Sequence, residues 1–357
     1  MQKFQMIDLF SGAGGLTLGF HMNELKGSFE SVLAIDNDQA SINTYNGMFG
    51  ERGICTDIEE WLRFNDVPKA DLVVGGPPCQ GFSLLNKKRM TDTRRALWEP
   101  YMDIVDQSDA KMFVMENVPD LLKSQEFLDI QKRAKDLGFT IHSQKLNSAN
   151  YGAPQVRNRV IVVAYKTEFI DFIPFPPEKT HQKPQPNMTL PPWRVVEDAI
   201  GDLAPPVGTS IRNCEPPYDL HFGRNPTSVS RMRYKLIPEG GNRFDLQRKA
   251  PELTPQCWIR KKSGGTDLFG RLWRDRPSVT IRTEFFKPEK GRYLHPTQDR
   301  PITHREAARL MGFPDDFRFC GSKIEIARQI GNAVPPPFAH EIAKVVNSAL
   351  KNATALV

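Results

Sequence analysis

A cysteine at position 79 follows two prolines at the end of a short apolar run. The segment reads Gly75-Gly76-Pro77-Pro78-Cys79-Gln80-Gly81-Phe82-Ser83 and comes directly after Leu72-Val73-Val74. A strand that stops at a Pro-Pro turn presents the next side chain at the edge of its sheet, where α/β folds bind ligands. The thiolate is the reactive form of cysteine, so this position predicts a nucleophilic Cys79.

Three other ionisable residues occur where predicted strands begin or end. Glu116 follows the apolar run 112–115, and Arg157 and Arg159 precede the apolar run 160–164. Side chains at positions i and i+2 of an extended segment point the same way, so the two arginines suit two contacts on one face of a ligand. Glu116 is expected at the same sheet edge as Cys79. We therefore predict that these groups act on one small molecule.

A glycine-rich turn near the N-terminus indicates a second binding site. The segment Asp8-Leu9-Phe10-Ser11-Gly12-Ala13-Gly14-Gly15-Leu16 joins the predicted strand 4–9 to a helical pattern. Glycines at such a turn let a ligand approach the backbone closely. Asp36 ends the next predicted strand, where a carboxylate can accept hydrogen bonds from ribose hydroxyls, and Asp57 is a third acidic strand end. The pattern predicts an adenosine ligand and leaves open a dinucleotide or S-adenosylmethionine.

Strands and helices alternate along the first half of the chain, which predicts an α/β fold with a doubly wound, Rossmann-like sheet. The predicted strands cover 4–9, 31–35, 72–74, 112–115, 139–146 and 160–164, and the predicted helices cover 16–20, 98–105, 121–137 and 338–350. Residues 172–227 are rich in proline, which disfavours regular sheet and indicates a hinge. We predict a catalytic and cofactor-binding domain at 1–170 plus 329–357, and a smaller, loop-rich domain at 171–328.

Composition and charge narrow the class of protein. The 357 residues are 39% hydrophobic and 25% charged, and no apolar run approaches the roughly 20 residues of a membrane helix, so we expect a cytoplasmic, nucleoid-associated protein without a membrane segment. The five cysteines form no CxxC pair, which argues against a disulfide framework and a metal site. Residues 221–300 hold 18 Lys and Arg against 8 Asp and Glu, an excess that fits phosphate contacts.

The motifs, taken in chain order, resemble those of the DNA (cytosine-5-)-methyltransferases of the bacterial type II restriction-modification or Dcm-like kind. The matching motifs are F-S-G-A-G-G at 10–15, G-P-P-C-Q-G at 76–81, E-N-V at 116–118, Q-V-R-N-R at 155–159, R-P-I-T-H-R-E-A-A-R-L-M-G-F-P at 300–314 and Q-I-G-N-A-V-P at 329–335. The resemblance covers nearly all of the chain except 165–270. Within the fifth motif, Thr303 is predicted to cap a helix, with Glu306 three residues on.

This resemblance implies roles for the catalytic residues. Cys79 would add to C6 of a cytosine that has been flipped out of the duplex, Glu116 would stabilise a proton at N3, and Arg159 would bind O2. Arg157 would support the site beside Glu116. The methyl group would come from S-adenosylmethionine, leaving S-adenosylhomocysteine as product.

The resemblance also implies the cofactor contacts. The matching positions are Phe10, Gly12, Gly14, Gly15, Asp36, Asp57, Pro78 and Asn332. Phe10 would pack on the adenine, and Asp36 would bind the ribose where the family usually has a glutamate. Asp57 would accept from the adenine amino group, and Asn332 would close the pocket.

The resemblance implies that the partner is double-stranded DNA. It also implies that the second domain, which includes the basic region, is a target-recognition domain. Ser83 and Arg94 match family positions on a loop that closes over DNA, and we predict further DNA contacts from Arg271 and Thr280. The sequence leaves open which arginine reads a base, and which sequence is read. A cognate restriction endonuclease would be a functional partner, and we expect a monomer.

Three alternative functions remain open from the sequence. A tRNA cytosine methyltransferase would share Cys79, Glu116 and Arg159, but the Cys-Phe-Thr tripeptide of that branch is absent. A catalytically silent DNA-binding homologue would have no chemical need for these residues. A nicotinamide oxidoreductase would explain the glycine turn but not the Pro-Pro-Cys segment or the basic region.

Overall fold

The computed structural model describes residues 3–78, 97–260 and 265–354, and the chain divides into two compact units. The first comprises Met1–Tyr151, Arg157–Thr180 and Ala333–Val357, and the second comprises Gly152–Val156 and His181–Asn332. These bounds differ from the predicted domains at 152–156, 171–180 and 329–332. The short segment 152–156 joins the second unit because its backbone pairs with that of Ser278.

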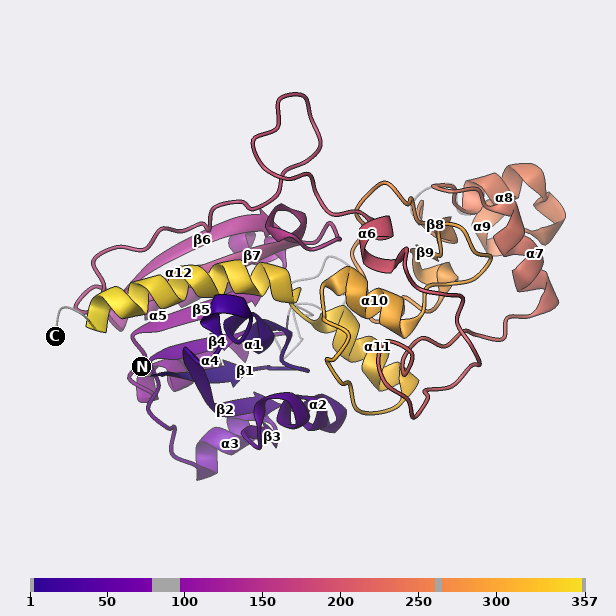
Figure 1. The fold of residues 1–357 in the computed structure, drawn as a ribbon. Helices are drawn as coiled ribbons and strands as arrows, with labels where there is room; N and C mark the ends of the chain where they lie inside the picture. The colour runs from indigo at the N-terminus through magenta and orange to yellow at the C-terminus, as the bar shows by residue number, and fades with distance from the viewer. Residues whose placement is uncertain (1–2, 79–96, 261–264, 355–357) are drawn as a thin grey trace. The chain divides into compact units, whose positions relative to one another are not determined.

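A seven-stranded sheet forms the centre of the first unit, in the order β3-β2-β1-β4-β5-β7-β6 (Figure 1). Its strands are β1 (Phe4–Leu9), β2 (Phe29–Asp36), β3 (Gly53–Cys55), β4 (Leu72–Gly75), β5 (Met112–Asn117), β6 (Phe139–Asn147) and β7 (Asn158–Lys166). The first five strands pair in parallel, whereas β7 lies antiparallel between β5 and β6. The order reverses next to β1, so the loops after β1 and β4 leave the sheet at a topological switch point.

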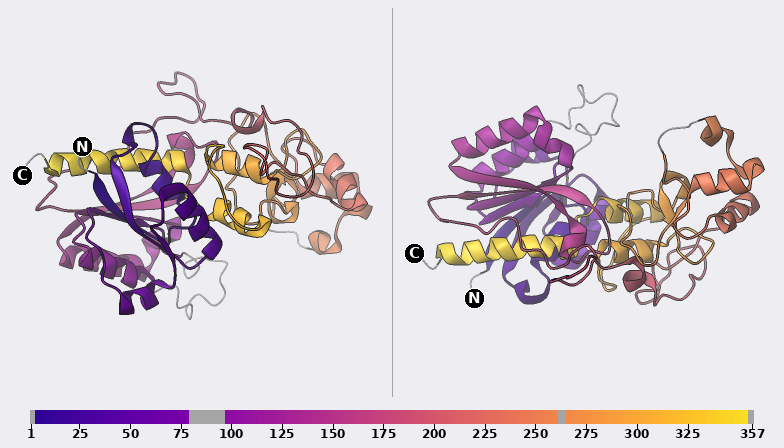
Figure 2. Two further views of the ribbon diagram at one scale, coloured as in Figure 1. Left: turned by 60° about the horizontal axis from the view of Figure 1, so that its bottom comes forward. Right: turned by 90° about the horizontal axis from the view of Figure 1, so that it is seen from above.

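Helices cover both faces of this sheet (Figure 2, right). The helices of the first unit are α1 (Gly15–Phe20), α2 (Gln39–Phe49), α3 (Ile58–Phe64), α4 (Trp98–Gln107), α5 (Gln125–Asp136) and α12 (Pro336–Thr354). Side chains alternate between the two faces along each strand, so Leu72 and Val74 face one core and Val73 the other. Both faces are therefore buried, which explains the nearly continuous apolar runs of the strands.

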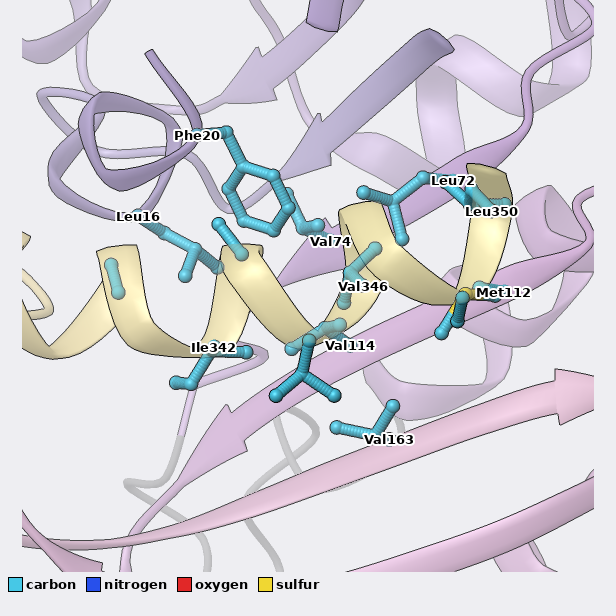
Figure 3. Packing of buried hydrophobic residues seen from close by; sticks show 14 of the residues in the cluster. Leu16, Phe20, Leu72, Val74, Met112, Val114, Val163, Ile342, Val346 and Leu350 are labelled. Atoms are coloured by element: carbon cyan, nitrogen blue, oxygen red, sulfur yellow. The ribbon is translucent and has the colours of Figure 1, made fainter. Parts of the chain in front are cut away.

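The long helix α12 returns from the far part of the chain to complete one of these cores. Figure 3 shows Ile342 and Val346 of α12 near Val114 of the sheet, and Leu350 near Leu72. Helix α1 packs closely on α12, because a Cβ atom on Gly19 would lie 2.5 Å from Ala339. The predicted helix 338–350 is thus confirmed, with two more residues at its start and four at its end.

One predicted helix is interrupted. The sequence predicted a single helix over 121–137, but the structure has a 3-10 turn, η5 (Pro119–Lys123), followed by α5. Ser124 separates the two and caps α5 by accepting from the Phe127 amide. A serine hydroxyl competes for backbone hydrogen bonds, so it starts a new helix here.

The second unit consists of short elements joined by loops. Its helices and strands are α6 (Val196–Ile200), α7 (Ser228–Leu236), α8 (Arg243–Lys249), α9 (Gln256–Arg260), β8 (Gly270–Arg271), β9 (Arg292–Leu294), α10 (His304–Met311) and α11 (Lys323–Asn332). The predicted cap of α10 is confirmed, since the Thr303 hydroxyl accepts from the Glu306 amide and the Glu306 carboxylate accepts from the Thr303 amide. No helix within the described ranges is long and apolar enough to cross a membrane.

Candidate active site

The carboxyl ends of the parallel strands bring the predicted site residues of the first unit to one edge of the sheet. Phe10 follows β1, Asp36 ends β2, Pro78 follows β4, and Glu116 lies near the end of β5. Parallel strands share this edge, so the elements, and not loops alone, position these side chains. Cys79 follows Pro78 directly but lies outside the described residues, as do Ser83 and Arg94.

Glu116 and Arg159 form an ion pair at this edge. The Arg159 Nε atom lies 2.8 Å from Glu116 Oε1, and the side chains are 17% and 13% exposed. Strands β5 and β7 are antiparallel neighbours, which places residues near the end of β5 opposite the start of β7. A mostly buried guanidinium–carboxylate contact is stronger than a solvated one, so each group fixes the other. The sequence had predicted both groups for one ligand, and they are in contact.

The turn that precedes Cys79 is fastened to the strand that carries Glu116. The Asn117 side-chain amide donates to the Pro77 carbonyl at 3.0 Å. A Cβ atom on Gly76 would lie 3.3 Å from Glu116 Oε2, so the glycine permits a close approach of this turn to the carboxylate. Asn117 therefore holds the Pro-Pro turn beside Glu116. Arg157 is buried near the start of β7, and its carbonyl accepts from the Ser148 amide at 3.0 Å.

The glycine turn after β1 adopts a conformation that depends on its glycines. Gly12 and Gly14 have φ values of +53° and +82°, in the left-handed region that favours glycine. A Cβ atom on Gly14 would also lie 2.3 Å from the Phe49 ring. The buried hydroxyl of Ser11 has no hydrogen-bond partner among the described residues. Buried polar atoms normally have a partner, so this hydroxyl fits a polar ligand group bound at the turn.

Asp36 is joined to the glycine turn by hydrogen bonds. Its Oδ2 atom accepts from the Gly12 amide at 2.8 Å, and its Oδ1 atom accepts from the Asp38 amide at 2.9 Å. Burial raises the pKa of this carboxyl above its ordinary value, and the two amides oppose that shift. The Gly12 contact fixes the turn relative to the end of β2.

Two other predicted cofactor residues, Asp57 and Asn332, belong to elements outside the glycine turn. Asp57 caps α3, and its Oδ1 atom accepts from the amides of Glu59 and Glu60 at 2.9 and 3.2 Å. Asn332 is exposed at the end of α11, in the second unit. Gly15 is buried as the first residue of α1.

Sequence reasoning did not assign a role to Asp8, which is buried within β1. Thr17 donates a hydrogen bond to its carboxylate, and burial raises the pKa of Asp8 to about 7. The Thr17 hydroxyl also lies 3.3 Å from the Tyr45 hydroxyl. The signal in the sequence was an acidic residue between Ile7 and Leu9, in a strand whose one other polar residue is Gln5.

Arg271, which the sequence predicts as a DNA contact, is buried in the structure. This side chain is 4% exposed, and its guanidinium is occupied inside the second unit. It donates at 2.6–2.8 Å to the carbonyls of Tyr234, Ile237, His295 and Gln298 and to the carboxylate of Asp299. Local charge in the sequence does not reveal burial, so Arg271 looked available. Thr280 is half-buried, and its hydroxyl donates to the Val156 carbonyl at 2.9 Å.

Comparisons with known proteins show the family to which this chain belongs. The profile of the family described as C-5 cytosine-specific DNA methylase matches residues 4–348. The type II methyltransferase M1.HphI of Haemophilus parahaemolyticus is 33% identical over 355 residues, covering 95% of this chain and 86% of that protein. The type II methyltransferase M.NgoFVII of Neisseria gonorrhoeae is also 33% identical, over 351 residues, covering 96% and 86%.

Solved structures give the same fold. An E. coli prophage protein assigned as a DNA modification methyltransferase superposes with a TM-score of 0.72 at 25% identity, covering 98% of this chain and 100% of that chain. The Entamoeba histolytica methyltransferase EhMeth superposes with a TM-score of 0.61 at 16% identity, covering 98% of this chain and 99% of that chain. At this identity the likeness is evidence for the fold only. The predicted Rossmann-like methyltransferase fold and the predicted family are therefore confirmed. The chain belongs to the C-5 cytosine-specific DNA methylase family and is a DNA cytosine methyltransferase.

Proposed function

We propose that this enzyme transfers a methyl group from S-adenosylmethionine to C5 of a cytosine that is flipped out of double-stranded DNA at a specific sequence, through a covalent Cys79 adduct. The observation that carries the proposal is the Glu116–Arg159 pair beside the turn that leads to Cys79. Cytosine has a ring nitrogen, N3, next to the carbonyl O2, so a carboxyl group that holds a proton on N3 and a guanidinium that donates to O2 would be complementary to it. The roles follow from these groups.

Cytosine C5 reacts only after the ring has gained electron density. The Cys79 thiolate forms a bond to C6, while Glu116 holds a proton on N3 and Arg159 donates to O2, so the displaced electrons make C5 nucleophilic. After methyl transfer, a base removes the C5 proton and the Cys79–C6 bond breaks, which restores the aromatic ring and the thiolate. Attack on C6 needs access to the face of the cytosine ring. Stacking with neighbouring bases blocks this face in a duplex, so the cytosine must leave the DNA helix.

The glycine turn after β1 suits the methyl donor. The donor supplies an electrophilic methyl carbon on a sulfonium. Gly12 and Gly14 allow close approach of the donor to the backbone, Ser11 offers its unsatisfied hydroxyl, and Asp36 lies next to this turn. Phe10, Gly15, Asp57, Pro78 and Asn332 remain the other proposed contacts. The relatives are named as type II methyltransferases, so we propose a role in restriction-modification with a cognate endonuclease.

Bisulfite sequencing of a mixed-sequence plasmid, after incubation with the enzyme and S-adenosylmethionine, tests this proposal. We expect protected cytosines in one short sequence context. Cys79→Ser serves as the control for the adduct, and should lose methylation while retaining binding of S-adenosylmethionine and DNA. Protection by the serine variant at the wild-type rate would refute the covalent step, and methylation of tRNA without DNA would refute the substrate.

A further inference from the structure

The segment 272–278 of the second unit has a fixed backbone. The carbonyls of Arg274 and Arg276 accept from the amides of Glu197 and Val196, the first residues of α6, at 3.0 and 2.9 Å. These amides lie in the first turn of the helix, where no partner within the helix is available. The segment is therefore held in one conformation even though it has little regular secondary structure.

The same segment pairs with residues 154–156 of the second unit. Ser278 donates from its amide to the Pro154 carbonyl at 3.0 Å and accepts from the Val156 amide at 2.9 Å. Val156 is followed in the chain by Arg157 and, two residues later, by Arg159. Segment 272–278 is thus fixed to residues 154–156 by two backbone hydrogen bonds within the second unit.

Trp273 makes cation–π contacts with two arginine side chains. The Arg292 guanidinium is 4.1 Å from the centroid of the indole ring, and the Arg276 guanidinium is 4.8 Å from it. Arg292 is anchored by hydrogen bonds of 2.7–2.9 Å to the carbonyls of Gly240, Gly241 and Arg271. The anchored Arg292 guanidinium holds the Trp273 indole ring, and this ring in turn supports Arg276 by a second cation–π contact.

Arg276, unlike Arg271 or Arg292, keeps its hydrogen-bond donors available. Its side chain is 61% exposed, and among the described residues its single ion pair is with Asp275 at 4.0 Å. Exposed pairs of this length contribute little to stability, so the pair yields to another acceptor at low cost. Arg274 differs, because its Nε atom pairs with Glu239 at 3.4 Å and its amide donates to the same carboxylate.

We propose that Arg276 is a specificity-determining residue that reads a guanine of the recognition sequence, an inference that rests on the proposed function. A guanidinium held against an indole ring by a cation–π contact loses less freedom when it donates to O6 and N7 of guanine than an unsupported guanidinium would. Its fork matches those two acceptors, which no other base presents together in the major groove. Trp273 orients Arg276 and acts as a positioning residue.

A pool of duplexes with randomised sequence tests this inference. Wild-type enzyme, Arg276→Lys and the control Arg274→Lys each methylate the pool, and bisulfite sequencing gives the preference at every position. We expect Arg276→Lys to lose preference for guanine at one position by about 10-fold or more, with the other positions unchanged, since lysine keeps the charge but not the fork. Arg274→Lys should keep the wild-type preferences.

A chemical change in the DNA provides a second measurement. A duplex with 7-deazaguanine at the affected position lacks the N7 acceptor, so wild-type enzyme should methylate it about as slowly as Arg276→Lys methylates ordinary DNA. Unchanged preferences in Arg276→Lys, or a uniform loss of rate over all sequences as expected for a phosphate contact, would overturn the inference. A wild-type enzyme that methylates no duplex would instead overturn the proposed function.

Discussion

Replacing Arg271 by methionine tests whether this buried arginine supports the second unit or binds DNA. Methionine has a similar length but no donor, so the variant removes all contacts of the guanidinium with little change in volume. Four backbone carbonyls and the Asp299 carboxylate then lose this donor, while the Tyr234 and Gln298 carbonyls still accept from the amides of Ile237 and Arg300. The carbonyls belong to two separate stretches, 234–237 and 295–298, which Arg271 joins.

The size of the effect follows from these contacts. A buried polar group without its partner costs about 1–3 kcal/mol, but carbonyls can regain partners from water or by small movements, so the costs do not add fully. Asp299 is 46% exposed and regains water when the guanidinium is removed, so the loss comes from the hydrogen bonds themselves, at about 0.5–1.5 kcal/mol for each of the five. We therefore expect Arg271→Met to lower the free energy of unfolding of the second unit by about 3–5 kcal/mol, a large part of the usual ~5–15 kcal/mol for a domain.

Urea denaturation and amide hydrogen exchange measure this loss, and exchange should accelerate in 234–241 and 295–299. Arg274→Met is the matched control, because its exposed ion pair with Glu239 should contribute less than about 1 kcal/mol. If Arg271→Met keeps wild-type stability within about 0.5 kcal/mol and loses DNA affinity, then Arg271 is a DNA contact and the structural role assigned to it is wrong.

Other predictions concern the first unit. Burial raises the pKa of Asp8 to about 7 in the folded protein. The buried charge should therefore lower the free energy of unfolding progressively as the pH rises from about 4 through 7. At ~1.4 kcal/mol per pKa unit this loss is about 2–4 kcal/mol, and Asp8→Asn should abolish it. Denaturation at pH 5 and pH 8 checks this, and a wild-type stability equal at both would contradict it. Gly14→Ala should cost about 1–3 kcal/mol and weaken S-adenosylmethionine binding in calorimetry, because its Cβ would collide with Phe49 and φ is positive; unchanged affinity would exclude the turn from the cofactor site. Glu116→Gln should lower kcat by about 100-fold or more in a methyl-transfer assay without changing cofactor affinity, since an amide cannot hold a proton on N3; a near-normal kcat would remove Glu116 from the chemistry.

The sequence was most informative where local patterns decide the structure. Apolar runs located the strands, and the run 112–115 became β5 with two residues more at its end. Because strands of one direction end at one edge, the position of Glu116 also followed. The sequence predicts that Glu116 and Arg159 serve one ligand, and in the structure the two side chains are in contact.

Contacts between distant parts of the chain could not be predicted from local sequence patterns. Arg271 and Arg276 lie five residues apart and have the same charge, but one is buried under carbonyls from two other segments and the other is exposed on an indole ring. The pairing of 152–156 with Ser278 joins residues more than 120 positions apart. No local pattern encodes such pairings, which depend on the tertiary fold.

The position of α12 also bears on how the protein folds during synthesis. The sheet face that includes Leu72, Val74 and Val114 is covered by a helix that the ribosome makes only after the whole second unit. Each such side chain gains about 1.5–3 kcal/mol from burial, so a nascent chain that stops before residue 336 carries an exposed apolar sheet. The ribosome must therefore synthesise the whole second unit before the core of the first unit can be completed. Until then the partial chain is a substrate for chaperones and proteases.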